Sequence, residues 1–294
     1  MTAYIKKKGV TIMCRNYSFF DLHRHDKYSY GDACGEPFSI VERAKELSYT
    51  SLGISNHGNI DSIAATHEAC IAAGIKPILG CEVYFQPDRK DDSTKTYHLC
   101  LFCKNKIGYE NLIKIVDDSK SCMKKGKGVV DFSLLDKFHD GIICTTACIC
   151  SSISQSILHG HTQAAIRMIK RFKSIFGDNF YIEIQPYDAD KKGTQRRINT
   201  VLLDLAAKTH VSCIITSDSH FCNEKDFNQY RSMHKMSPDI EKLYAKRYMP
   251  SDDDITKSFL SMMYGRVSNE RKVYDMLVKN LNRLSDSVTI YDIK

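Results

Sequence analysis

Short apolar runs alternate with stretches of helical periodicity along most of this 294-residue chain. The apolar runs predict β-strands, which begin with SFFDLH ending at His23 and continue at residues 50–55, 75–85, 97–103, 141–145, 180–184 and 211–216. The periodic stretches predict helices at residues 37–47, opened by Pro37, and at 60–73, 109–116, 162–176 and 195–208. Strands that alternate with helices usually build parallel sheets, so we expect an α/β sheet or barrel.

The chain carries neither a predicted membrane span nor a predicted secretory signal. Its apolar runs stop well short of about 18 residues, and its lysine-containing N-terminus lacks an apolar segment followed by a cleavage site. We therefore expect a cytoplasmic protein that does not contact a membrane. If the chain is phage-encoded, the compartment would be the host cytoplasm. In that reducing compartment most of the 12 cysteines are expected to be buried thiols.

The formal charge of +7 slightly favours a polyanionic partner such as nucleic acid. The basic residues fall in local clusters at residues 6–8, 124–127, 170–173 and 196–197. Solvated helix faces explain most of these clusters without any partner. Charge alone therefore does not decide the function.

Side chains that bind metals gather where the predicted strands end. His23 and His25 share one face of an extended segment, and further candidates follow or lie within other strands, namely His57, Glu82, His98, Cys148, Asp218 and His220. The carboxyl ends of parallel strands share one face of a barrel, although His98 begins its predicted strand. Imidazoles, carboxylates and one thiolate suit zinc, manganese or iron better than calcium.

Each of these signals has an ordinary alternative when taken alone. An H-x-H pair is common in alternating strands, and Asp218-Ser219-His220 could be a hydrogen-bonded loop. Cys148 could belong to a buried thiol cluster with Cys144 and Cys150. Six further histidines have no motif support and are expected on the surface or on helix faces, namely His67, His139, His159, His161, His210 and His234.

Taken in order, the motifs resemble the PHP (polymerase and histidinol phosphatase) domain family, in the form found in the bacterial DNA polymerase III α subunit. The resemblance lies in FFDLHRHDKYSYGDA, ISNHGNI, AGIKPILGCEVYF, YHLCLFCKNKIGYENLIKIV, TTACIC, FYIEIQPY, QRRIN and SDSHF. YMPSDDDITKSF and NLNRLSDSV resemble the segments that follow the domain in the polymerase. The resemblance implies a distorted (β/α)7 TIM-like barrel at residues 1–230 and a helical extension at residues 231–294.

The resemblance also implies up to three divalent ions (zinc, manganese or iron, with magnesium less favoured). One ion would bind His23, His25, Glu82 and Asp218. A second would share Glu82 and take His98 and Cys148, where other branches of the family have histidine. A third would use Asp32, His57 and His220. Asn56 stands where the family usually has aspartate, which could weaken or tune the site by about 10–100-fold.

The implied chemistry is hydrolysis of a phosphoester, because clustered divalent ions activate water and stabilise negative charge on a phosphate. We expect a 3′-5′ exonuclease acting on single-stranded 3′ ends of DNA, with Asp218, His98 and His220 in catalysis and Arg24, Arg196 and Arg197 on phosphates. Two alternatives stay open. One is a PHP module of weak activity that docks on a replicative DNA polymerase, and the other is a small-molecule phosphatase of the histidinol phosphatase type.

Overall fold

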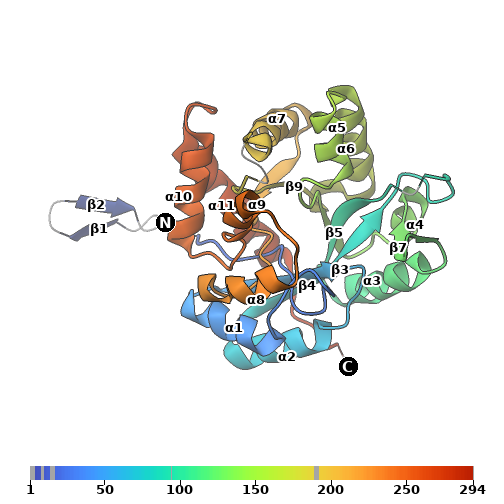
Figure 1. Cartoon of the computed structure of the whole chain (residues 1–294), viewed down its shortest axis with the longest axis horizontal. Helices are drawn as coiled ribbons and strands as arrows, with labels where there is room; N and C mark the ends of the chain where they lie inside the picture. Colours follow the sequence, from blue (N-terminus) through green and yellow to red (C-terminus); the bar gives the residue numbers. More distant parts are fainter. Residues whose placement is uncertain (1–3, 8–9, 14–16, 94, 189–191, 294) are drawn as a thin grey trace.

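The computed structural model describes the whole chain except residues 1–3, 8–9, 14–16, 94, 189–191 and 294. Near the N-terminus, β1 (Tyr4–Lys7) and β2 (Val10–Met13) pair with each other as a separate antiparallel sheet. The rest of the described chain builds one α/β body, with helices arranged around a central sheet (Figure 1).

The central sheet has the order β10-β9-β8-β5-β4-β7-β6, and β3 pairs with β4. Its strands are β3 (Ser51–His57), β4 (Lys76–Phe85), β5 (Tyr97–Cys103), β6 (Met123–Lys124), β7 (Lys127–Val130), β8 (Ile142–Thr145), β9 (Phe180–Ile184) and β10 (Ser212–Ile215). Six of these match the apolar runs predicted from the sequence to within a few residues. The short β6–β7 hairpin has no such apolar run and was not predicted.

The sheet is not fully parallel, because β5 runs antiparallel to both of its neighbours, β4 and β8. The other main pairs, β3 with β4, β8 with β9 and β9 with β10, are parallel as expected. The reversed direction explains why His98 seemed to begin its strand at the wrong end. The start of β5 lies beside the carboxyl ends of its neighbours, and His98 is in register with Tyr84 of β4.

The strand predicted to end at His23 is absent, and an irregular segment takes its place. The Asp21 carbonyl accepts a hydrogen bond from the Gly53 amide at 2.8 Å, and the His25 amide donates to the Ser219 carbonyl at 2.9 Å. The segment therefore links β3 to the chain after β10 and closes the sheet into a distorted barrel. Gly53 permits this contact, because a Cβ there would lie 1.8 Å from the Leu22 carbonyl oxygen.

The first helices surround the barrel (Figure 1). They are α1 (Pro37–Glu46), α2 (Ile63–Ala73), α3 (Lys106–Ser119), α4 (Phe132–Lys137), α5 (Ser152–Leu158), α6 (Thr162–Phe176) and α7 (Thr194–Thr209). Those at residues 37–46, 63–73, 106–119, 162–176 and 194–209 lie close to the predicted ranges, and the short helices at residues 132–137 and 152–158 were not predicted. Local signals set their ends. Asn105 caps α3 by accepting a hydrogen bond from the Gly108 amide, and Gly74 ends α2 in the left-handed conformation.

The C-terminal part consists of α8 (Phe227–Ser232), α9 (Pro238–Tyr244), α10 (Asp252–Met263) and α11 (Glu270–Ser287). Buried side chains of α10 and α11, including Phe259 and Leu281, join the same apolar core as the barrel strands. The Asn280 side chain also donates to the Cys213 carbonyl of β10 at 2.9 Å. The predicted boundary between residues 230 and 231 falls inside α8, and the division into two domains stays a prediction.

Candidate metal centre

Four predicted ligands from distant parts of the chain converge in the structure, and we call them the first cluster. His25 Nε2 lies 3.3 Å from His23 Nε2, 3.2 Å from Glu82 Oε2 and 3.3 Å from Asp218 Oδ1. His23 Nε2 lies 3.5 Å from Glu82 Oε2 and 3.3 Å from Asp218 Oδ1. All four side chains are buried. The irregular segment, β4 and the turn after β10 each supply part of this cluster.

The spacing of these atoms fits a small divalent ion. The five separations given above between ligand atoms of the first cluster span 3.2–3.5 Å. Two ligand atoms that bind one zinc ion at about 2.0–2.1 Å lie about 3.3 Å apart at the tetrahedral angle, which is close to these separations. Two imidazoles and two carboxylates also suit manganese or iron.

Charge in the first cluster is balanced between acids and imidazoles. Burial opposes ionisation of Asp218, but Arg247 and His23 outweigh it and hold the pKa of that carboxyl well below its usual range. Burial likewise disfavours charged His25, yet hydrogen bonds to the Asp218 and Glu82 carboxylates raise its pKa to about 9. The Asp218 and Glu82 carboxylates are therefore ionised at neutral pH. The imidazoles carry protons, and a bound metal ion would displace those protons.

The second cluster, formed by Glu82, His98 and Cys148, uses the other oxygen of the shared carboxylate. His98 Nδ1 lies 2.9 Å from Glu82 Oε1 and 3.5 Å from the Cys148 sulfur. The Cys148 sulfur lies 3.9 Å from Glu82 Oε1. Glu82 Oε2 faces the first cluster and Oε1 the second, so this carboxylate can bridge two ions.

The third cluster brings together Asp32, His57 and His220. Asp32 Oδ2 lies 3.0 Å from His57 Nε2 and 3.2 Å from His220 Nε2. Although burial opposes ionisation of Asp32, the charge of His220 and hydrogen bonds from both histidines hold its pKa far below its usual range. His57 Nδ1 lies 3.2 Å from Glu82 Oε2, which connects this cluster to the other two.

Buried partners orient the histidines of the first cluster. His23 Nδ1 lies 2.8 Å from Glu183 Oε2, so it donates its proton there and leaves Nε2 free to bind metal. Thr145 and Thr216 both donate hydrogen bonds to Glu183. These hydrogen bonds hold the His23 ring and the Glu183 carboxylate in one orientation.

Asn56 lies in a second buried network behind His25. His25 Nδ1 lies 2.9 Å from Ser29 Oγ, which donates to Asn56 Oδ1 at 2.9 Å. The Asn56 amide donates to Asp26 Oδ1 at 2.7 Å and to Ser62 Oγ at 2.9 Å. A carboxylate at position 56 would face the Asp26 carboxylate, so the neutral amide suits its surroundings in this chain.

The structure brings all nine predicted ligands together, and which of them bind metal stays a prediction. The three predicted phosphate contacts behave differently. Arg24 is fully buried, and its Nη2 donates to the His25 carbonyl at 2.8 Å. The expectation that Arg24 contacts phosphate is therefore wrong, because its side chain points into the protein. Arg196 and Arg197 line a surface pocket of about 360 Å³ outside the metal-binding clusters.

Sequence reasoning missed four residues near these clusters. Glu183 is a lone carboxylate within the apolar FYIEI run, which was a usable signal. Cys150 forms a C-x-C pair with Cys148. A hydrogen bond between the two side chains lowers the pKa of Cys150 to about 6. Arg247 Nη1 lies 2.7 Å from Asp218 Oδ2. His234 lies 3.0 Å from the Asp32 carbonyl oxygen. Arg247 and His234 fall in the predicted C-terminal extension, and neither belongs to a motif.

Comparisons with known proteins agree with this arrangement. A family model of the PHP domain matches residues 21–187. The DNA polymerase III α subunit of Aquifex aeolicus is 30% identical over 93% of this chain and 25% of its own length. The α subunit of Treponema pallidum is 30% identical over 71% of this chain and 18% of its own length. The chain thus spans a quarter or less of these relatives.

Among solved structures, an amidohydrolase from Chromobacterium violaceum is 14% identical, with a TM-score of 0.47 over 80% of this chain and 99% of that one. This likeness is too loose to support a conclusion about activity. No helix within the described residues is long and apolar enough to cross a membrane. The family match covers 167 of 294 residues and includes His23, His25, His57, Glu82, His98 and Cys148. The chain belongs to the PHP domain family.

Proposed function

We propose that this protein is a metal-dependent phosphoesterase that removes nucleotides from the 3′ end of single-stranded DNA. The observation that carries the proposal is the convergence of three ligand clusters, joined through Glu82, on one pocket beside a strongly basic surface. The pocket has a volume of about 140 Å³ and is lined by residues of all three clusters together with Tyr244 and Arg247.

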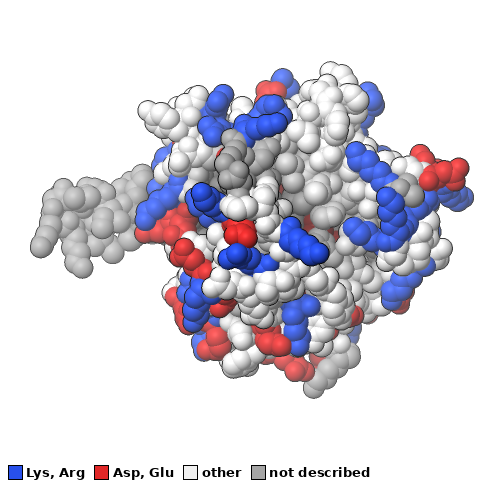
Figure 2. Space-filling view, in the orientation of Figure 1, with Lys and Arg blue, Asp and Glu red and all other residues white. Residues whose placement is uncertain are grey.

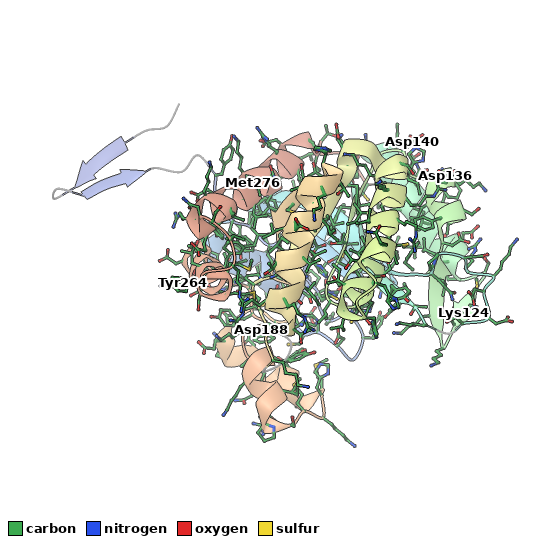
Figure 3. All side chains as sticks on the ribbon, turned by 90° about the horizontal axis from the view of Figure 1, so that it is seen from above. Lys124, Asp136, Asp140, Asp188, Tyr264 and Met276 are labelled. Carbon is green, nitrogen blue, oxygen red and sulfur yellow. The ribbon has the colours of Figure 1, made fainter. Side chains whose placement is uncertain are left out.

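The basic surface lies next to the metal-binding clusters across one short segment. Tyr244 and Arg247 line the metal pocket, whereas Lys242 and Lys246 of the same segment line a neighbouring pocket of about 420 Å³. Figure 3 shows this α8–α9 region standing out from one end of the barrel, with Asp188 labelled beside it. A strand of nucleic acid that enters the metal pocket would therefore pass close to these lysines.

Cationic side chains dominate the neighbouring pocket. Its described lining includes Arg196, Lys242, Lys246 and Lys257, against one carboxylate, Asp188. Figure 2 shows Lys and Arg side chains gathered around the centre of the face on which α8 and α9 lie. Repeated phosphates bind such a surface through charge, without regard to base sequence. This arrangement favours a polymeric substrate over a small phosphoester.

The chain's own residues would position the phosphate and move protons. Bound divalent ions supply activation of water and stabilise charge on the attacked phosphate. Arg247 presents a guanidinium at the pocket, and its contact with Asp218 keeps that carboxylate oriented toward the first cluster. His98 and His220 line the same pocket, where we propose that they assist proton transfer to a leaving oxygen.

A docking role on a replicative polymerase is the second candidate. It is favoured by the relatives, which are α subunits of DNA polymerase III at least four times the length of the matched region. In that case the metal-binding clusters would stabilise the fold rather than cut DNA.

The deciding experiment measures nucleotide release from 3′-labelled single-stranded DNA with manganese or zinc, beside the variant Asp218→Ala/His220→Ala. Stepwise release that disappears in this variant supports the exonuclease. No release despite bound metal, with p-nitrophenyl phosphate esters also untouched, supports the docking role. Cleavage of the small ester alone points to a small-molecule phosphatase.

A second pair of variants tests the basic surface. Arg196→Ala/Lys257→Ala is expected to raise KM for DNA and weaken its salt dependence, while hydrolysis of the small ester stays unchanged. The matched control is Lys106→Ala/Lys272→Ala, which removes two exposed lysines outside the basic pockets. Equal effects of the two double variants would remove the support for a DNA path over this surface.

A further inference from the structure

We propose that Cys150 is a ligand of the second cluster, completing a site of two thiolates, one imidazole and one carboxylate that selects zinc. The inference rests on the metal-dependent part of the proposed function and is independent of the substrate. It adds a tenth ligand to the nine that the family resemblance implied, at a position that the resemblance did not assign.

The thiol groups and the imidazole already lie close enough to share one ion. The Cys148 sulfur, the Cys150 sulfur and a ring nitrogen of His98 all lie within 4.8 Å of one another. The Cys148 sulfur is 3.5 Å from His98 Nδ1. In a tetrahedral zinc site, a Zn–S bond of about 2.3 Å and a Zn–N bond of about 2.0–2.1 Å place sulfur and nitrogen about 3.5 Å apart. The observed separation equals that value.

The backbone holds both cysteines at this position. They lie in the turn that follows β8, where the Ser151 amide donates to the Cys148 carbonyl at 3.0 Å. The His98 amide donates to the Cys150 carbonyl at 3.2 Å, which ties this turn to the start of β5. Ser151 then caps α5 by accepting a hydrogen bond from the Ser154 amide at 3.0 Å. The Cys148-Ile149-Cys150 turn is therefore anchored on both sides before any ion binds.

The second cluster differs from the first and third clusters in its types of ligand. Thiolates favour zinc over manganese, whereas the first and third clusters offer imidazoles and carboxylates that accept either metal. Four protein ligands also close a tetrahedral zinc site, since none of its four positions is left for water. The second cluster would then retain zinc while the first and third exchange their ions, and the centre would hold two kinds of metal.

Cobalt absorption tests the assignment directly, because cobalt–thiolate bonds absorb in the near ultraviolet. Metal-free protein, kept reduced, is titrated with Co²⁺ and then with Zn²⁺. We expect a band in the wild type that falls to about half in Cys150→Ser and in Cys148→Ser, as for a site with two thiolates, and is absent from the double variant. Cys122→Ser, which changes a partly exposed cysteine elsewhere, is expected to match the wild type.

Alkylation gives a second readout on the unmodified protein. Cys150 is exposed, so iodoacetamide is expected to modify it in the metal-free protein and to modify it at least tenfold more slowly after one equivalent of Zn²⁺. A full-intensity cobalt band in Cys150→Ser, or equal alkylation with and without zinc, would overturn the assignment. If DNA is not cut while both readouts hold, the nuclease proposal fails and the zinc site stands.

Discussion

The first and second clusters share Glu82 but differ in how firmly the protein holds them. His23 and His25 are fully buried, and each donates from its second ring nitrogen to a buried oxygen, of Glu183 and Ser29 respectively. The His98 side chain is 20% exposed, and its neighbours in the second cluster include cysteines on a turn. One centre therefore combines a preorganised site of imidazoles and carboxylates with a softer site at the solvent edge. Changes to the first should alter metal occupancy and chemistry, and changes to the second should alter metal preference.

The largest effect is expected from Asp218→Asn, which keeps the left-handed backbone that Asp218 adopts at φ +55°. The change removes a ligand of the first cluster and the charge that pairs with Arg247. We expect phosphoesterase activity to fall by more than about 100-fold, because loss of a ligand exceeds the usual cost of losing an outer partner. Metal analysis should show that one equivalent is lost while the second cluster keeps its ion. Full occupancy with full activity would contradict the role given to the first cluster.

A smaller effect is expected from Glu183→Gln, which keeps the shape of the side chain that orients His23 but removes its charge. Metal affinity of the first cluster should fall by about 10–100-fold, with the second cluster unchanged. Competitive titration with a chromophoric chelator measures both affinities. Glu110→Gln, on the exposed face of α3, is the matched control. An equal loss at both clusters would show that Glu183 supports the barrel as a whole.

Metal affinity of the first cluster should also depend on pH through His25. Its pKa in the metal-free fold is raised from 6.5 to about 9. The protonated ring therefore stabilises the metal-free fold fully below pH 6.5, and this contribution is lost as the pH rises through about 9. Metal binding needs the neutral ring, so apparent affinity should rise by up to about tenfold per pH unit across that window. Calorimetry of the wild type and of His25→Gln measures the slope, and a flat wild-type profile would refute the assignment.

The smallest effect concerns Asn56, where the family usually has aspartate. Asn56→Asp would set two buried carboxylates together, because the Asn56 amide now lies 2.7 Å from Asp26 Oδ1. We expect the free energy of unfolding to fall by roughly 1–3 kcal/mol, measured by denaturant titration. The exchange variant Asp26→Asn/Asn56→Asp should recover most of that loss. If the Asn56→Asp variant were as stable as the wild type and bound metal more tightly, the result would show that the Asn56 amide lowers the metal affinity of the site.

Much of the fold could be predicted because the local signals agreed with one another. Pro37 opens α1 as predicted, and six of the seven predicted apolar runs became strands of the barrel. Where local pattern and tertiary packing disagreed, packing prevailed. The residues around His23 alternate as a strand would, yet they form an irregular segment, because they must reach both β3 and the turn after β10.

The candidate site divides in the same way. The side chains that gather in the three clusters could be predicted from their places near strand ends and from the family resemblance, and their role as ligands stays a prediction. The orienting role of Glu183 could not be predicted, because it depends on a hydrogen bond between residues 160 positions apart. The burial of Arg24 and the approach of Arg247 to Asp218 were hidden for the same reason.

By itself, the sequence determined most of the strands and helices of the barrel, which side chains can bind metal and that the chain carries excess positive charge. These properties follow from local periodicity and from the chemistry of single residues. The tertiary structure alone decided the reversed direction of β5, the burial of Arg24 and the contacts that Glu183 and Arg247 make with the first cluster. Those properties depend on which distant segments lie side by side, and that is settled by packing of the whole core rather than by any one stretch of chain.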